Sequence, residues 1–137
     1  MSLLGRKHSY AKLADVPFFD GWSKEELAHV DRVAEWVDYR PGETLIKQGT
    51  TGYEFIVILE GDVDVAVDGQ TIAELGPGDH VGEMALLDGS PRNATVTAKT
   101  AVRALLVGSR EFRGLVDQVP SLDRKLLVSL TRRLREK

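Results

Sequence analysis

The amino-acid sequence predicts a mainly β domain, a sandwich or barrel of short strands with flanking helices. Between residues 44 and 107, short apolar or alternating runs are separated by turns rich in glycine and proline. Evenly spaced short strands of this kind are typical of all-β folds. Apolar residues at helical spacing stand before and after this region, so we expect helices at both ends of the chain.

Length and composition fit one domain, residues 1–137, with a core from about residue 13 to residue 134. The apolar fraction of 42% suffices for one hydrophobic core. The net charge of −3 offers no basic surface for nucleic acid, and the absence of cysteine excludes disulfides and Cys-based metal sites. The longest unbroken apolar run, Phe55 to Leu59, is far shorter than the roughly 20 residues of a membrane span. Without a secretory signal either, we expect a cytoplasmic protein with no membrane partner.

The first helix is predicted by a capping box followed by helical spacing. Ser23 precedes Glu26 by three residues, a pair that closes a helix N-terminus with two reciprocal hydrogen bonds. The apolar residues that then recur at helical spacing are Leu27, Val30, Val33, Ala34 and Val37. We therefore expect an amphipathic helix that packs on the rest of the domain and reaches about Val37.

The central region reads as strands joined by turns. Thr44 to Ile46 is a short strand, and the continuously apolar run Phe55 to Leu59 indicates a strand covered on both faces. The segment from Val63 to Val67 alternates as a half-buried strand does. Asp68-Gly69 is the preferred two-residue hairpin turn, so the chain should return along residues 70–75.

Two helices are predicted after the last strand, residues 102–107. Ser109 is the expected N-cap of the first, which Pro120 ends, and Ser121 is the expected cap of the second. The apolar stripe of the final helix consists of Leu122, Leu126, Leu127, Leu130 and Leu134. This stripe either packs on the strands or pairs in part with a second chain.

The segment from Val81 to Val96 carries the strongest functional signal. Gly82 allows close backbone approach, and residues 83–87 are long enough for only one or two helical turns. The unpaired N–H groups at the start of such a turn, together with the guanidinium of Arg92, form an anion pocket. Pro91 stiffens the chain before Arg92, and the guest that this pocket fits best is a phosphate.

Two further features of this segment narrow the class of ligand. Arg92 precedes the alternating run Asn93 to Ala98, so we expect its side chain to project from the start of a strand, where it can make bidentate phosphate contacts. Glu83 would repel a phosphate unless it accepted hydrogen bonds, and a sugar hydroxyl is the usual donor. Phosphate and ribose together predict a nucleotide.

These residues resemble the phosphate-binding cassette of the cyclic nucleotide-binding domain family, found in regulatory subunits of protein kinase A, in cyclic nucleotide-gated channels and in the catabolite activator protein. The matching residues are Gly82, Glu83, Met84, Ala85, Leu86, Leu87, Pro91, Arg92, Ala94, Thr95 and Val96. The resemblance extends from about Leu13 to Leu134. It implies a double-stranded β-helix, a jelly-roll-like β-roll, with an N-terminal helix and two C-terminal helices.

The resemblance also implies roles for individual residues. Arg92 would bind the cyclic phosphate, Glu83 with the backbone of Gly82 would hold the ribose 2′-OH, and the backbone N–H groups of Ala85 and Asn93 would complete the phosphate cradle. The implied ligand-binding residues are thus Gly82, Glu83, Met84, Ala85, Arg92, Asn93 and Ala94. No aromatic residue follows Phe112, so a cap on the base would be a leucine or arginine of the final helix, or be absent. Weak base selectivity follows.

The resulting hypothesis is a non-catalytic sensor of cyclic AMP or cyclic GMP that relays binding through its C-terminal helices and needs no cofactor or metal. One acid and one arginine suit binding, whereas hydrolysis needs metal ions or a placed base. A cupin-like metal enzyme would need clustered histidines, but His8, His29 and His80 lie far apart in sequence.

The main alternative is a domain of the same fold that has lost its ligand and acts through protein contacts. Asn93 raises it, because the family usually has Ala, Ser or Thr at this position. No output segment follows the last predicted helix, so we expect an effector protein, or a second copy bound through the C-terminal helix, to read the signal.

Overall fold

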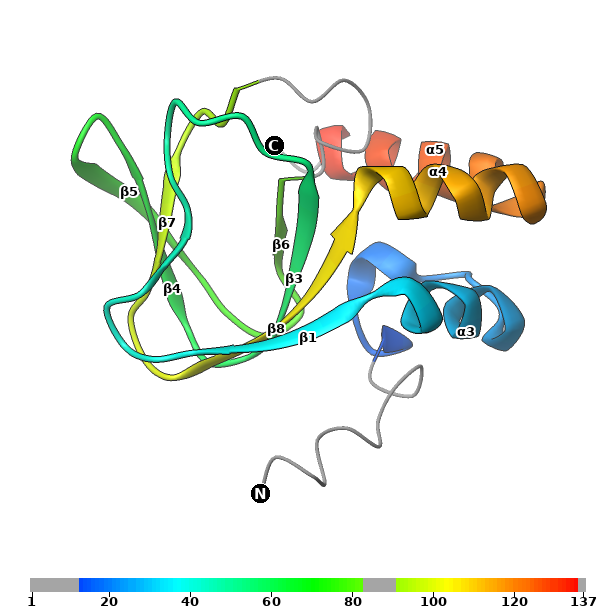
Figure 1. Cartoon of the computed structure of the whole chain (residues 1–137), viewed down its shortest axis with the longest axis horizontal. Coiled ribbons are helices and arrows are strands. Elements are labelled where there is room, and N and C mark those ends of the chain that lie inside the picture. The colour runs from blue at the N-terminus through cyan, green and yellow to red at the C-terminus, as the bar shows by residue number, and fades with distance from the viewer. Residues whose placement is uncertain (1–12, 83–90, 136–137) are drawn as a thin grey trace.

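The chain folds into a roll of antiparallel strands with its helices gathered at one end (Figure 1). The computed structural model describes residues 13–82 and 91–135. Within these residues, two four-stranded sheets form, with the strand orders β1-β8-β3-β6 and β2-β7-β4-β5. All pairings between neighbouring strands are antiparallel.

The elements have the following bounds. The strands are β1 (Glu35–Tyr39), β2 (Thr44–Ile46), β3 (Glu54–Glu60), β4 (Val63–Val67), β5 (Gln70–Leu75), β6 (His80–Val81), β7 (Thr95–Ala98) and β8 (Val102–Gly108). The helices are the 3₁₀ turn η1 (Pro17–Phe19), α3 (Lys24–Val33), α4 (Ser109–Gln118) and α5 (Ser121–Arg135). None of the helices in the described part of the chain is long and apolar enough to cross a membrane.

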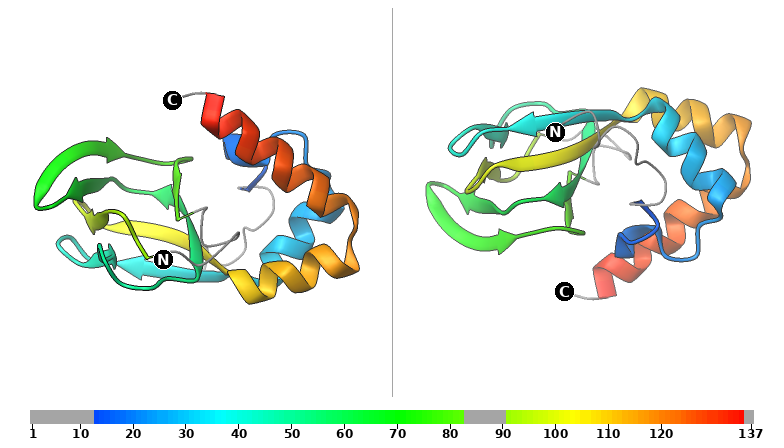
Figure 2. Two further views of the ribbon diagram at one scale, coloured as in Figure 1. Left: turned by 90° about the horizontal axis from the view of Figure 1, so that it is seen from above. Right: turned by 90° about the horizontal axis from the view of Figure 1, so that it is seen from below.

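This architecture confirms the predicted fold class, a β-roll with one N-terminal helix and two C-terminal helices. The views in Figure 2, from above and below, show the strands in one half of the molecule and the helices in the other. The hairpin between β4 and β5 is also as predicted, because Asp68 and Gly69 both have positive φ, 52° and 83°. Two consecutive positive φ values are what a type I′ turn requires.

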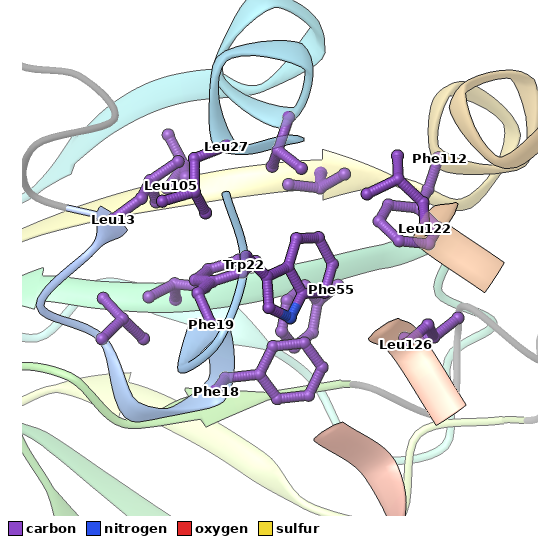
Figure 3. Close-up of a cluster of buried hydrophobic side chains, with 14 of the residues drawn as sticks. Leu13, Phe18, Phe19, Trp22, Leu27, Phe55, Leu105, Phe112, Leu122 and Leu126 are labelled. Atoms are coloured by element: carbon purple, nitrogen blue, oxygen red, sulfur yellow. The ribbon is translucent and has the colours of Figure 1, made fainter. Parts of the chain in front are cut away.

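Strand β3 is buried on both faces, as its continuous apolar run predicts. Phe55, Val57 and Leu59 point to a cluster shared with the helices, whereas Ile56 and Ile58 point to a second cluster between the two sheets. In the first cluster, aromatic side chains from the N-terminal segment gather around Phe55, and leucines approach from α5 (Figure 3). The two clusters join the sheets and the helices into one core.

Helix α5 is fastened to the N-terminal segment by buried hydrogen bonds. The Trp22 indole Nε1 donates to Ser129 Oγ over 3.2 Å, and Ser129 Oγ donates to the carbonyl oxygen of Phe18 over 2.6 Å. Each polar group in this small network has a hydrogen-bond partner. Burying these groups therefore does not incur the free-energy cost of an unsatisfied donor or acceptor.

Glu26 connects the start of α3 with the start of α5. The predicted capping box is present, since the Ser23 backbone N–H donates to Glu26 Oε1 over 2.7 Å and the Glu26 N–H donates to Ser23 Oγ over 3.1 Å. The same carboxylate accepts a bond of 2.6 Å from Ser121 Oγ, and Lys125 Nζ lies 3.5 Å from it. The side chain of Glu26 therefore caps the N-terminus of α3 and also binds the start of α5.

The prediction that the first helix reaches Val37 is wrong. Helix α3 ends at Val33, with Ala34 as its C-cap, and Val37 lies in β1 opposite Ala104 of β8. The segment Glu35–Tyr39 contains Trp, Val and Tyr, which favour strands, and the ladder along β8 satisfies its backbone. Tertiary pairing here overrides the helical spacing of the apolar residues.

The C-terminal helices differ from prediction in their N-cap residues and in the exposure of one leucine of α5. Gly108 is the N-cap of α4, so Ser109 is the first helical residue and not the cap, and Ser121 likewise lies inside α5. Leu122 and Leu126 are buried and Leu130 packs beside them, but Leu127 is 57% exposed and does not belong to the buried stripe. The side chain of Leu134 lies outside the described residues.

We predict that the carboxylate of Glu26 stabilises the fold in a pH-dependent way. Burial alone would raise the pKa of Glu26, but hydrogen bonds from Ser121 and Ser23 and the charge of Lys125 outweigh it and hold the pKa below its ordinary value of 4.5. A depressed pKa adds stability above pH 4.5 that is lost as the pH falls through the folded-state value. Glu26→Gln should cost about 1–2 kcal/mol of unfolding free energy at neutral pH.

Denaturant unfolding at several pH values checks this prediction. The difference between wild type and Glu26→Gln should shrink as the pH drops below 4.5. Glu25→Gln, on the exposed side of the same turn, is the control and should change stability by less than about 0.5 kcal/mol. A difference for Glu26→Gln that is the same at neutral and acidic pH would show that the charge of Glu26 is not what matters.

Candidate functional site

A cavity of about 380 Å³ lies against the β2-β7-β4-β5 sheet and β6. It is lined by Ile46, Val65, Val67, Ile72, Ala73, Leu75, His80, Val81, Gly82, Arg92, Asn93, Ala94 and Val96. Four of the predicted site residues, Gly82, Arg92, Asn93 and Ala94, are thus brought to one cavity. Glu83, Met84 and Ala85, the other three, lie outside the described residues. The volume is within the range of small-molecule sites.

The backbone of Arg92 is held by the segment before β3. Pro91 forms an isolated antiparallel bridge with Thr51, the Arg92 N–H donates to the carbonyl of Thr50 over 2.8 Å, and the carbonyl of Arg92 accepts from the Gly49 N–H over 2.8 Å. Strand β7 begins only at Thr95, so the prediction that Arg92 projects from the start of a strand is wrong. These backbone bonds nevertheless fix its position in the irregular segment before the strand.

The guanidinium of Arg92 is largely withdrawn from solvent. Its side chain is 9% exposed, Nη2 donates to the carbonyl oxygen of Glu54 over 2.8 Å, and the carboxylate oxygen Oε1 of Glu54 lies 3.9 Å from Nη2. Burial lowers the pKa of Arg92, and the charge of Glu54 acts in the opposite direction. An arginine side chain stays protonated in proteins, so the site keeps its positive charge.

Two glycines form the walls on either side of this guanidinium. A Cβ on Gly82 would lie 2.6 Å from Nη1 of Arg92 and 2.8 Å from the carbonyl oxygen of Glu54. A Cβ on Gly52 would lie 2.5 Å from Nη2 of Arg92. Gly82 also has a φ of +80°, a conformation that residues with a side chain rarely adopt. Gly82 thus allows the close backbone approach that its place in the sequence predicts.

The rest of the cavity is mainly apolar. Side chains of β4 and β5 form one wall, and Ile46 and Val96 contribute from β2 and β7. The charged Arg92 and the amide of Asn93 lie at the same cavity, so the lining combines an apolar surface with a few polar groups. This composition is typical of pockets that hold a small molecule in one orientation.

A second cavity, of about 300 Å³, shares two lining residues with the first. Leu75 and His80 line both, and residues of η1, the turn before β6 and α5 complete the second one: Pro17, Phe18, Gly78, Asp79, Ser129 and Arg132. Arg132 Nη1 lies 3.8 Å from Asp20 Oδ2, and its buried Nη2 makes no hydrogen bond to another described residue. A cationic side chain of α5 therefore stands next to the wall of the first cavity.

His80 lies in aromatic surroundings and not in a metal site. It is 8% exposed, and its ring centroid is 4.6 Å from that of Phe18 and 5.4 Å from that of Phe55. Over residues 13–82 and 91–135, no group of three or more His, Cys, Asp or Glu side chains could hold a metal ion.

Sequence reasoning missed Gly52 and Glu54 as residues of the site. They stand about 40 residues before Arg92, and no motif marks them. The signal that could have found them is the bridge between Thr51 and Pro91, which depends on strand pairing across the roll. The apolar lining from β4 and β5 was likewise predicted only as strand, not as a wall of the site.

Fold and pocket together define a binding domain with a built-in cationic group, and comparison with known proteins assigns its family. Residues 36–119 match the family model of the cyclic nucleotide-binding domain. The chain therefore belongs to this family, as its resemblance predicts.

Individual relatives agree with this assignment. The chain is 38% identical over 121 residues to the cAMP-dependent protein kinase regulatory subunit of Mycosarcoma maydis, covering 81% of this chain and 23% of that protein. The N-terminal domain of a transcriptional regulator from Streptomyces coelicolor superposes with a TM-score of 0.82 at 30% identity, covering 91% of this chain and 93% of that one.

A third relative belongs to a kinase that is named as cAMP-independent. The regulatory subunit of a cAMP-independent protein kinase A from Trypanosoma brucei has a TM-score of 0.72 at 30% identity, covering 83% of this chain and 43% of that one. The chain spans 23–39% of the length of the curated relatives that it matches. All three relatives described here are named as regulatory proteins.

Proposed function

We propose that the cavity beside Arg92 binds a cyclic nucleotide, cyclic AMP or cyclic GMP, and that the domain is a non-catalytic sensor. The observation that carries this proposal is the guanidinium, a charge at the cavity whose side chain is only 9% exposed. A buried charge is costly unless it is paired. Within the described part of the chain, the carboxylate of Glu54, 3.9 Å away and itself 54% exposed, compensates this charge weakly. A phosphodiester would be a closer anionic partner.

The remaining contacts follow from membership of the family. Glu83 and the backbone of Gly82 would hold the ribose 2′-OH, and the backbone N–H groups of Ala85 and Asn93 would complete the phosphate cradle. Met84 and Ala94 belong to the same cassette. In this arrangement the phosphate would lie at the cationic end of the cavity, and the base would pack against the apolar wall of β4 and β5.

The relay would run from Arg92 to the C-terminal helices through the start of β3. Glu54 accepts the hydrogen bond from Arg92, and the carbonyl of its neighbour Tyr53 accepts a bond of 2.7 Å from the N–H of Ser109, the first residue of α4. A ligand that pulls Arg92 toward the cavity would thereby act close to the N-terminus of α4. Such a relay works only if the ligand binds one arrangement of the helices better than another.

The proposal predicts thermal stabilisation by cyclic AMP or cyclic GMP but not by 5′-AMP. At a hundredfold excess over Kd, a ligand should add roughly 2.7 kcal/mol to the unfolding free energy. Arg92→Ala should weaken binding by roughly 10- to 100-fold, because it removes charge-assisted hydrogen bonds to the phosphate. Differential scanning fluorimetry and titration calorimetry provide the two readouts.

Arg110→Ala, which removes an exposed arginine of α4, is the matched control and should bind as wild type does. If neither cyclic nucleotide raises Tm, the sensor proposal fails and the ligand-free alternative replaces it. If Arg92→Ala still binds with wild-type affinity, the phosphate partner is a different residue.

For the base, we infer that Arg132 is the best placed of the described α5 side chains to serve as a cap. It stands at the second cavity, which shares Leu75 and His80 with the first, and its Nη2 has no hydrogen-bond partner among the described residues. A guanidinium donates well to the O6 and N7 acceptors of guanine, whereas the exocyclic amine of adenine is a donor. A single flexible side chain of this kind fits weak base selectivity.

We predict that Arg132→Ala weakens cyclic GMP binding more than cyclic AMP binding, by less than about tenfold in relative terms. Calorimetric titration of both ligands into both proteins measures this ratio. Arg132→Lys, which keeps the charge but loses the planar donors, should resemble Arg132→Ala. An unchanged ratio in both variants would remove Arg132 from base recognition.

A second candidate function is a ligand-independent interaction module of the same fold. The observation that favours it is the outer face of α5, where Leu127 is 57% and Val128 is 52% exposed beside a shallow groove that Thr131 and Arg132 complete. An effector protein or a second copy of the chain could cover this face. The melting experiment separates the two functions, since only the sensor requires a stabilising nucleotide.

A further inference from the structure

Gly52 lies against the guanidinium of Arg92, although 40 residues separate the two in sequence. The bridge between Thr51 and Pro91 sets their neighbours side by side. Gly52 is buried, and a Cβ on it would lie 2.5 Å from Nη2 of Arg92 and closer still to Nε and Cζ. Real Cβ atoms essentially never approach another heavy atom within 3.0 Å. No side chain fits at position 52 while Arg92 occupies its place.

The backbone conformation does not explain a glycine at this position. Gly49 and Gly82, with φ of +87° and +80°, lie in the left-handed region that favours glycine, but Gly52 does not. We propose that Gly52 is a positioning residue for Arg92: its missing side chain provides the slot that holds the guanidinium at the cavity. This inference rests on the proposed function for its consequence, phosphate binding.

The neighbours of Gly52 decide what a substitution would do. The three atoms nearest to an added Cβ all belong to the outer part of the Arg92 side chain, which is flexible. Gly52→Ala should therefore displace the guanidinium and leave the backbone in place. Gly82→Ala is a poorer probe, because its Cβ would also meet the backbone carbonyl of Glu54 and its φ is positive.

A displaced Arg92 would lose its hydrogen bond to the carbonyl of Glu54 and its position beside Gly82. The charge would remain in the protein, but no longer at the cavity. Gly52→Ala should therefore mimic the removal of the arginine in binding.

Calorimetric titration with cyclic AMP and cyclic GMP tests this consequence. Gly52→Ala should weaken binding by the same factor as Arg92→Ala, roughly 10- to 100-fold. Gly114→Ala is the matched control, because Gly114 has no atom within 4 Å of an added Cβ and no positive φ, and it should bind as wild type does. Wild-type affinity in Gly52→Ala would overturn the proposal.

A double-mutant cycle on thermal stability tests the slot without any ligand. Gly52→Ala should lower Tm in the wild-type background, but leave Tm unchanged or raise it in the Arg92→Ala background, where the slot is empty. An equal loss of Tm in both backgrounds would overturn the proposal. So would failure to fold of both Gly52→Ala and the double variant. If only the double variant folds, the proposal is supported.

The two readouts also separate this inference from the proposed function. If the wild-type protein binds neither cyclic nucleotide, the sensor proposal fails, while the stability cycle still decides whether Gly52 makes room for Arg92. If the nucleotides bind and the cycle shows no coupling, only the positioning role is lost.

Discussion

The constraint on which the site depends is the cost of keeping one positive charge inside the domain. The side chain of Arg92 is 9% exposed, and a charge so placed must be compensated by hydrogen bonds or by an opposite charge. Among the described residues, Glu54 supplies a backbone carbonyl at 2.8 Å and a carboxylate at 3.9 Å. The protein also supplies two glycine walls that leave room for the group. This partial compensation gives the cavity its proposed capacity for a phosphate.

The fold explains how residues from distant parts of the chain create this arrangement. The two sheets close the roll, and Gly49 to Glu54 then runs beside the segment that carries Pro91 and Arg92. Glu54, the first residue of β3, accepts a hydrogen bond from the guanidinium, and Tyr53, just before the strand, accepts one from Ser109 at the start of α4. Helix α5 is in turn bound to the N-terminal segment through Ser129 and to α3 through Glu26. Site and helices therefore share one strand end, which suits the proposed relay.

Much of this could be predicted from local sequence, because local chemistry determines it. The capping box of Ser23 and Glu26, the Asp68-Gly69 hairpin and the double-faced burial of β3 each follow from a few adjacent residues. The helical prediction for Val37 is wrong, because helical spacing does not reveal pairing with β8. The same spacing does not reveal which leucines of α5 meet the core, and Leu127 is exposed. Gly52 and Glu54 could not be identified from the sequence as site residues. They lie beside Arg92 only because the fold pairs two segments about 40 residues apart, at the bridge between Thr51 and Pro91.

The most direct test of the central claim observes the guanidinium itself by NMR. In a ¹⁵N-labelled protein, the Nε–H resonance of Arg92, assigned by its loss in Arg92→Lys, reports the surroundings of that group. Before ligand is added, the resonance should be sharp and shifted from those of exposed arginines. The reason is that the Nε–H proton of a guanidinium held in a slot exchanges slowly with water. Cyclic nucleotide should then move the Arg92 resonance while leaving the signal of Arg40, an 87% exposed arginine in the turn after β1, unchanged. A resonance that exchanges as fast as those of exposed arginines and does not respond to cyclic nucleotide would contradict this interpretation.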